Sequence, residues 1–109
     1  AAMNVSNELG CGFLEAVYKD ALSEEFKAAG IPYKREQKFE VVYKGVVLPH
    51  YYHSDFIVYD KIVLEIKAQQ DVIAANYRQV INYLAVSNLK LGLLVNFGES
   101  SLKFKRVVL

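Results

Sequence analysis

Two acidic residues and a lysine lie on neighbouring segments whose composition is typical of a β-hairpin. Asp55 belongs to the run Tyr51 to Val58, and Glu65 and Lys67 belong to the run Ile62 to Ala68. Both runs are rich in β-branched and aromatic residues, and a short polar turn separates them. Paired antiparallel strands are therefore expected here, and the pairing decides where the three charged side chains meet.

The apolar pattern of the two runs determines the register of this hairpin. Side chains alternate between the two faces of a strand, so a three-residue turn collects the large apolar residues on one face: Phe56, Val58, Ile62, Leu64 and Ile66. In that register Asp55 lies directly across from Glu65, with Cβ atoms roughly 5 Å apart. His53 then lies across from Lys67 on the same face.

Two carboxylates at facing positions favour a bound metal ion. Like charges directly opposite one another destabilise a sheet unless protonation, a nearby cation or a metal compensates them. Carboxylate oxygens suit Mg²⁺ or Mn²⁺, which fill their remaining positions with water and substrate phosphate oxygens. A metal held by Asp55 and Glu65 would lower the pKa of its bound water and polarise a phosphate. Lys67 would orient the attacking water or offset charge in the transition state, so the pattern indicates phosphodiester hydrolysis.

The same residues have a structural alternative. A Glu-x-Lys sequence on a strand is commonly a solvated face with a weak ion pair. Asp55 at the matching register favours the metal site over this alternative. Glu36, His50 and His53 are weaker candidates, because a lone histidine near a strand end is more often simply exposed.

The other elements must hold this hairpin in place. Apolar residues at helical spacing predict a helix from Phe13 to Ala29, ended by Gly30, and a longer one from Val72 to about Asn88, with Asp71 as its N-cap. Further strands are expected at residues 39–43, 46–48, 91–97 and 102–109, with turns at 44–45 and 98–101. The order α-β-β-β-α-β-β indicates one α/β domain over residues 1–109, with a mixed central sheet flanked by helices.

Length and composition restrict the class of protein. A chain of 109 residues with 53% hydrophobic and 23% charged residues is expected to form one globular domain. It has no apolar run of the roughly 18 residues that a membrane helix needs and no signal-peptide pattern at its start, so a cytoplasmic location is predicted. The single cysteine, Cys11, forms neither an internal disulfide nor a zinc pattern, and we interpret it as a small packing residue.

The net charge of +1 excludes a strongly basic protein, so any binding to nucleic acid would depend on local patches. Two basic clusters qualify, one near the start of a strand and one along the last strand, where alternation could bring its members to one face: Lys34, Arg35 and Lys38, and Lys103, Lys105 and Arg106. Charged strand positions are commonly just solvated, and this alternative stays open for each cluster.

A nearly end-to-end likeness to a known family adds to this interpretation. Gly12, Glu15 and Tyr18 fit the Gly-x-x-Glu-x-x-Tyr signature of the GxxExxY family, which is placed in the PD-(D/E)XK nuclease superfamily. The chain resembles that family at further positions as well: Tyr43-Lys44-Gly45, Asp55, Glu65-Ile66-Lys67, Gln79 with Tyr83, Asn96-Phe97-Gly98 and Lys105-Arg106. Ser54 stands in the place of the proline that names the motif. The superfamily core is similar to the order of elements predicted above.

The resemblance implies a role for each residue of the hairpin motif. Asp55 and Glu65 would be ligands of Mg²⁺ or Mn²⁺, with the backbone carbonyl of Ile66 as a further ligand, and Lys67 would be the catalytic lysine. Glu15 shares a helical face with apolar residues, and a partly buried carboxylate needs a partner. A first-helix glutamate often reaches the metal in the superfamily, so Glu15 is assigned a metal-side role, with a structural hydrogen bond as the alternative.

Gln79 and Tyr83 are four residues apart and therefore stack on one helical face. The pair resembles the Gln-x-x-x-Tyr motif of the exonuclease branch, in which the glutamine lies at the edge of the active site and the tyrosine approaches nucleic acid. Gln79 joins the catalytic set on this basis, and Tyr83 joins Lys105 and Arg106 as nucleic-acid contacts. Helical glutamine and tyrosine are otherwise usually surface or core residues.

The sequence thus favours a metal-dependent nuclease that hydrolyses phosphodiester bonds, with DNA as the favoured substrate and Mg²⁺ or Mn²⁺ as cofactor. Two alternatives stay open. One is an inactive nuclease-fold module that binds nucleic acid or assembles with protein, and the other is a different metal-dependent reaction at the same carboxylates. Many small domains of the superfamily work as homodimers or with a protein partner, and no membrane partner is expected.

Overall fold

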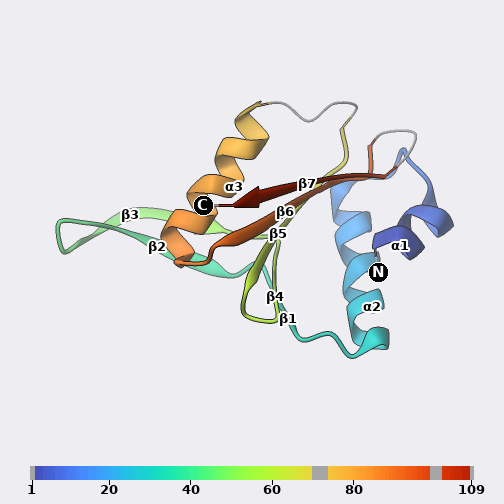
Figure 1. The fold of residues 1–109 in the computed structure, drawn as a ribbon, viewed down its shortest axis with the longest axis horizontal. Helices are drawn as coiled ribbons and strands as arrows, with labels where there is room; N and C mark the ends of the chain where they lie inside the picture. The colour runs from blue at the N-terminus through green and yellow to red at the C-terminus, as the bar shows by residue number, and fades with distance from the viewer. Residues whose placement is uncertain (1, 70–73, 99–101, 109) are drawn as a thin grey trace.

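A mixed five-stranded sheet with helices on both faces forms the body of the molecule (Figure 1). The computed structural model describes residues 2–69, 74–98 and 102–108. The elements in chain order are α1 (Ala2–Leu9), α2 (Glu15–Ala29), β1 (Tyr33–Arg35), β2 (Lys38–Tyr43), β3 (Val46–His53), β4 (Phe56–Val58), β5 (Ile62–Lys67), α3 (Ala74–Ser87), β6 (Leu91–Asn96) and β7 (Lys103–Val108).

The strand order of the main sheet is β1-β4-β5-β6-β7. β5 and β6 are parallel, and the other neighbours are antiparallel. A parallel pair needs a crossover connection, and α3 lies in the chain between β5 and β6. The predicted mixed sheet flanked by helices is confirmed.

The register predicted for the central hairpin is also confirmed. Phe56 pairs with Leu64, and Val58 pairs with Ile62. The resulting apolar face packs against α1 and α2 in one core cluster, whose buried members include Tyr18, Leu22, Phe26, Phe56, Val58, Leu64 and Ile66. The opposite face packs against α3 in a second cluster: Ile57, Val63, Val80, Tyr83, Leu84, Leu94 and Val107. Both faces of the sheet are therefore covered, as a mixed sheet with a parallel pair requires.

The expected single strand from Tyr51 to Val58 is wrong, because the chain changes sheets in its middle. β3 ends at His53 and pairs with β2 in a separate two-stranded sheet, whereas β4 begins at Phe56 in the main sheet. Backbone hydrogen bonds secure the break: Ser54 N–H donates to Gln37 O, and Glu36 N–H donates to Asp55 O. His53 consequently lies opposite Lys38 and not opposite Lys67.

The elements also differ from those predicted at other places: β1 was not predicted, and β3 runs through Pro49 to His53 and does not end at residue 48. The described residues include an additional helix, α1, whose one buried side chain, Val5, joins the core beside α2. Helix α2 begins at Glu15 and not at Phe13, because Leu14 has extended backbone angles (φ −66°, ψ 151°). Its predicted end is confirmed, since Gly30 adopts the left-handed conformation (φ 69°) and its N–H donates to Lys27 O.

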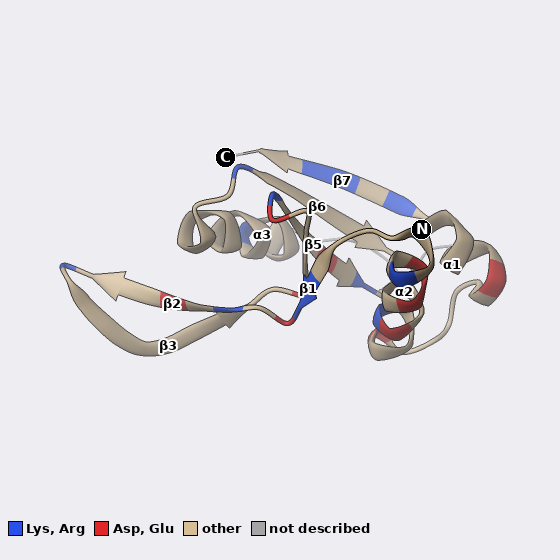
Figure 2. Cartoon of the chain, turned by 90° about the horizontal axis from the view of Figure 1, so that it is seen from below, with Lys and Arg blue, Asp and Glu red and all other residues tan. Residues whose placement is uncertain are grey.

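The two-stranded sheet β2–β3 is an arm that projects from the body (Figures 1 and 2). Its turn at Lys44 and Gly45 is confirmed, and both residues have positive φ, 49° and 78°. The outer part of the arm carries exposed apolar side chains: Val42, Tyr43, Val46 and Val47. Near the body, the arm packs against α3 through Phe39 and Tyr52.

Three further expectations have mixed outcomes. Cys11 is exposed, so its interpretation as a packing residue is wrong. No helix in the described part of the chain is long and apolar enough to cross a membrane. The N-cap at Asp71, the helical positions Val72 and Ile73, the turn residues 99–101 and the strand end at 109 lie outside the described residues.

Candidate active site

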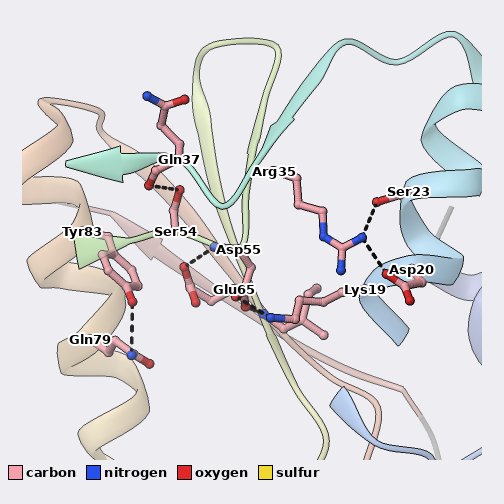
Figure 3. A network of polar contacts seen from close by, with 11 residues as sticks. Lys19, Asp20, Ser23, Arg35, Gln37, Ser54, Asp55, Glu65, Gln79 and Tyr83 are labelled. Carbon is pink, nitrogen blue, oxygen red and sulfur yellow. Dashed lines mark hydrogen bonds and ion pairs between the residues drawn. The ribbon is translucent and has the colours of Figure 1, made fainter. Parts of the chain in front are cut away.

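Asp55 and Glu65 meet at the point where the chain enters β4 (Figure 3). The backbone N–H of Asp55 donates to Glu65 Oε1 at 3.1 Å. The Ile66 N–H donates to Asp55 Oδ2 at 2.7 Å. The predicted neighbourhood of the two acids is present, although Asp55 lies beside the ladder and not within it. The Asp55 carboxylate thus lies beside Ile66, near the end of β5.

Lys19 on α2 completes the polar contacts of Asp55. Its Nζ lies 3.2 Å from Asp55 Oδ1, and the two side chains are only 16% and 13% exposed. Both oxygens of Asp55 are thus bonded, one to an ammonium group and one to a backbone amide. Such charge-assisted bonds hold a carboxylate in one orientation.

Glu65 is the buried member of the pair, with 2% of its surface exposed. Burial, and next the charge of Asp55, raises the pKa of Glu65 to about 9, while the charge of Lys67 acts in the opposite direction. Without a metal the Glu65 carboxyl is therefore protonated at neutral pH, because a buried carboxylate beside another carboxylate is unfavourable. A cation that reaches the pair would favour its ionised form.

Lys67 lies two residues after Glu65 on β5 and is half-buried. Alternation places its side chain on the same face as Glu65. Its positive charge acts to lower the pKa of Glu65. Among the described residues, however, the ion pair with the acidic site is made by Lys19.

Tyr83 and Gln79 border the site on α3 (Figure 3). Gln79 Nε2 donates to the Tyr83 hydroxyl at 3.3 Å. Burial, followed by the charges of Glu65 and Asp55, raises the pKa of Tyr83 to about 12, so its hydroxyl keeps its proton. Tyr83 is only 6% exposed, and its ring packs edge-on against Tyr52 of the arm, at 5.5 Å between centroids. The structure thus gives this tyrosine a packing role, and its contact with nucleic acid stays a prediction.

The donor set suits a divalent cation of the Mg²⁺ type. Mg²⁺ is usually bound by one or two carboxylates and retains several waters. Asp55 and Glu65 supply two carboxylates on neighbouring residues, since the Asp55 backbone N–H donates to Glu65 Oε1. The described residues contain no group of three or more His, Cys, Asp or Glu that could hold a metal. Glu15, half-buried at the start of α2, is therefore not gathered with the pair, and its metal-side role and that of the Ile66 carbonyl stay predictions.

Two basic clusters have different surroundings from those expected. Lys105 and Arg106 are exposed on the edge strand β7, which β6 separates from β5. Lys103 and Lys105 share a face, but Arg106 points to the other one, so a single-faced cluster of three is wrong. In the other cluster, two members form ion pairs with acidic residues. Arg35 Nη1 lies 2.7 Å from Asp20 Oδ1, and Lys34 Nζ lies 3.2 Å from Asp60 Oδ1.

Sequence reasoning missed Lys19 and the structural part played by Asn96. Lys19 is four residues from Glu15, which was the available signal that it faces the same side of the helix. Asn96, 1% exposed at the end of β6, accepts from Gln69 N–H at 3.1 Å and from Gly98 N–H at 3.0 Å and donates to Gln69 O at 2.8 Å. It ties the segment after β5 to the segment after β6.

Comparisons with known proteins agree on the fold. A family model described as the PD-(D/E)XK nuclease superfamily matches residues 1–107. The solved structure titled "Crystal structure of SSO0001" is similar with a TM-score of 0.70 at 20% sequence identity. The match covers 85% of this chain and 48% of that one, so this chain spans about half the length of the solved protein. No curated protein matches the chain.

Proposed function

Because this chain belongs to the PD-(D/E)XK nuclease superfamily, we propose that it hydrolyses phosphodiester bonds in nucleic acid, with DNA as the favoured substrate. The observation that carries the proposal is the contact between Asp55 and the buried Glu65, with Lys67 on the same strand. Two neighbouring carboxylates in a partly buried place cannot both be ionised at low cost without a nearby cation. A divalent cation would allow both Asp55 and Glu65 to be ionised.

Asp55 and Glu65 would hold Mg²⁺ or Mn²⁺, with the Ile66 carbonyl and Glu15 as further candidates. Such an ion supplies an activated water at neutral pH and neutralises charge on the phosphate. The chain prepares the ligands in advance: the Ile66 N–H orients Asp55, and the Asp55 N–H orients Glu65. Preorganised donors of this kind need no rearrangement during the reaction.

Lys67 would place its ammonium group beside the scissile phosphate and offset the charge that develops there. Gln79 borders the site on α3 and would hold the edge of the substrate or of its water shell. Lys105 and Arg106, exposed on β7, would contact the backbone of the nucleic acid away from the reacting bond. A homodimer or a protein partner would extend this surface.

One observation favours a second candidate function. Glu65 is 2% exposed, and a covered ligand suits an inactive module that binds nucleic acid or assembles with protein through the same fold. Such a module would bind without turnover. A cleavage assay therefore distinguishes the two functions, because only the nuclease would cut nucleic acid.

The test is Mn²⁺-dependent cleavage of single-stranded and double-stranded DNA and RNA by the unmodified chain, Glu65→Ala and Lys67→Ala. Each substitution should lower the rate roughly 100-fold or more, the usual effect of removing one group that stabilises the transition state. Lys27→Ala is a matched control, because Lys27 pairs with Glu24 on an exposed face of α2. Cleavage that survives both site substitutions rules out this site, and nucleic-acid binding without any cleavage favours the inactive module.

A further inference from the structure

A lysine from a different element occupies the acidic site. Lys19 Nζ lies 3.2 Å from Asp55 Oδ1, although the two residues are 36 positions apart in the chain. The ammonium group is largely removed from solvent, with 16% of the side chain exposed. It therefore takes one of the two oxygens that Asp55 would offer to a metal.

Side chains next to Lys19 on α2 fix the helix against the sheet. Tyr18 is fully buried and stacks on Phe97 at 4.5 Å between ring centroids. Further along the helix, the Arg35 guanidinium lies 2.7 Å from Asp20 Oδ1 and donates to Ser23 Oγ at 3.3 Å (Figure 3). The helix is thus anchored on the sheet, and the Lys19 ammonium group stands at the end of a flexible four-carbon stem.

Asp55 already has a cationic partner in Lys19. The Lys19 ammonium compensates the Asp55 carboxylate, and the buried Glu65 contacts the Asp55 backbone. A divalent cation on the two carboxylates would lie within a few ångströms of the ammonium group, where like charges repel strongly in a partly buried site. Lys19 and the cation therefore compete for Asp55 Oδ1.

We propose that Lys19 is a positioning residue that acts as the resident counter-ion of Asp55, holding this ligand in its metal-free orientation and leaving Asp55 Oδ1 when a divalent cation binds. The inference rests on the proposed function, because it concerns the same cation site. It adds a residue that weakens binding of the cation and keeps the acidic site folded without it.

Mn²⁺ titration calorimetry on the full chain at one pH and one ionic strength tests the inference. Lys19→Met should bind Mn²⁺ about five- to tenfold more tightly than the unmodified chain, the order expected for the loss of one competing charge. The same variant should unfold at a lower temperature in EDTA, because Asp55 loses its counter-ion. A purely structural role for Lys19 would weaken metal binding, so the sign separates the two explanations.

Matched variants keep the test decisive. Lys19→Arg retains the charge and Lys27→Met removes an exposed charge from the same helix, so each should bind Mn²⁺ within about twofold of the unmodified chain. Lys19→Gln removes the charge but can still donate a hydrogen bond to Asp55. If Lys19→Met does not fold, Lys19→Gln should bind Mn²⁺ more tightly than the unmodified chain. Asp55→Asn should abolish the binding.

Two results would overturn the inference, and they are distinguishable. If the unmodified chain binds Mn²⁺ through Asp55 while Lys19→Met and Lys19→Gln bind it equally or more weakly, the counter-ion role is wrong and the proposed function stands. If no variant binds Mn²⁺ in a way that depends on Asp55, both the counter-ion role and the metal-dependent function are wrong.

Discussion

Glu65 shows at the scale of one residue how the fold prepares a charged ligand. It follows Leu64 in the apolar strand β5, and both faces of this strand are covered by helices. The chain thus buries a carboxyl group that an exposed strand would leave in water. The consequence is a pKa of about 9 in place of 4.5, caused first by burial and then by Asp55.

This raised pKa predicts how stability depends on pH. Between the unfolded value of 4.5 and the folded value of about 9, the folded chain binds a proton at Glu65 that the unfolded chain has lost. The free energy of unfolding of the metal-free protein should therefore fall as pH rises through this window, by on the order of several kcal/mol for this group alone. Glu65→Gln is neutral throughout and should remove this part of the slope.

Denaturant unfolding in EDTA at several pH values across the window measures the effect. Glu24→Gln is the control, since the Glu24 side chain is 75% exposed and should leave the slope unchanged. Equal slopes for the unmodified chain and Glu65→Gln would show that Glu65 is not buried as a protonated group.

At the scale of elements, the close packing of α3 on β6 depends on a glycine. A Cβ added at Gly92 would lie 2.5 Å from Val80 Cγ1 on α3. Gly92→Ala should lower the free energy of unfolding by about 1–3 kcal/mol, the usual cost of overpacking a core. Chemical denaturation measures this directly.

A second substitution shows whether the cost comes from this one contact. Val80→Ala removes the methyl group that the new Cβ would meet, so the double variant should be less destabilised than the sum of the two single variants. Additive effects would mean that Gly92 is needed for a reason other than its approach to Val80.

The elements that sequence could predict are those whose signal is local. The hairpin register followed from the alternation that puts Phe56 and Leu64 on one face, and the end of α2 followed from Gly30. The break at Ser54 could not be predicted in the same way. Strand-forming residues flank it on both sides, at 51–52 and 56–58. The backbone bonds that secure the break come from Glu36 and Gln37, in a segment distant in sequence.

The site shows the same division between local and long-range signals. The neighbourhood of Asp55 and Glu65 was predictable because it depends on one hairpin. The Lys19 contact depends on how α2 crosses the sheet, which in turn depends on the Arg35 contacts and the aromatic packing of Tyr18. The spacing of Glu15 and Lys19 indicates which side of the helix Lys19 faces, but it does not indicate how the helix crosses the sheet.

The whole molecule divides into a covered sheet and a projecting arm, and the two should differ in their contribution to stability. Val63 in β5 is completely buried, whereas Val47 in the arm is 51% exposed. Val63→Thr places a hydroxyl in the core and should cost about 1–3 kcal/mol. Val47→Thr makes the same chemical change at the surface and should stay within about 0.5 kcal/mol.

Thermal and denaturant unfolding of this matched pair measures the difference. A similar loss in both variants would mean that the arm is packed against something in solution, for example against a second copy of the chain. The test thus also addresses the predicted homodimer, because an arm buried in an assembly would respond like the core.

We propose that Asp55 and Glu65 together hold a divalent cation in a nuclease fold. The most direct measurement is a crystal structure of the unmodified chain with Mn²⁺, using anomalous scattering to locate the ion. We predict a peak within roughly 2.0–2.3 Å of carboxylate oxygens from both residues, with Lys19 Nζ withdrawn from Asp55. A fully occupied Mn²⁺ site elsewhere, with the acidic pair and Lys19 unchanged, would show that Asp55 and Glu65 are not the ligands.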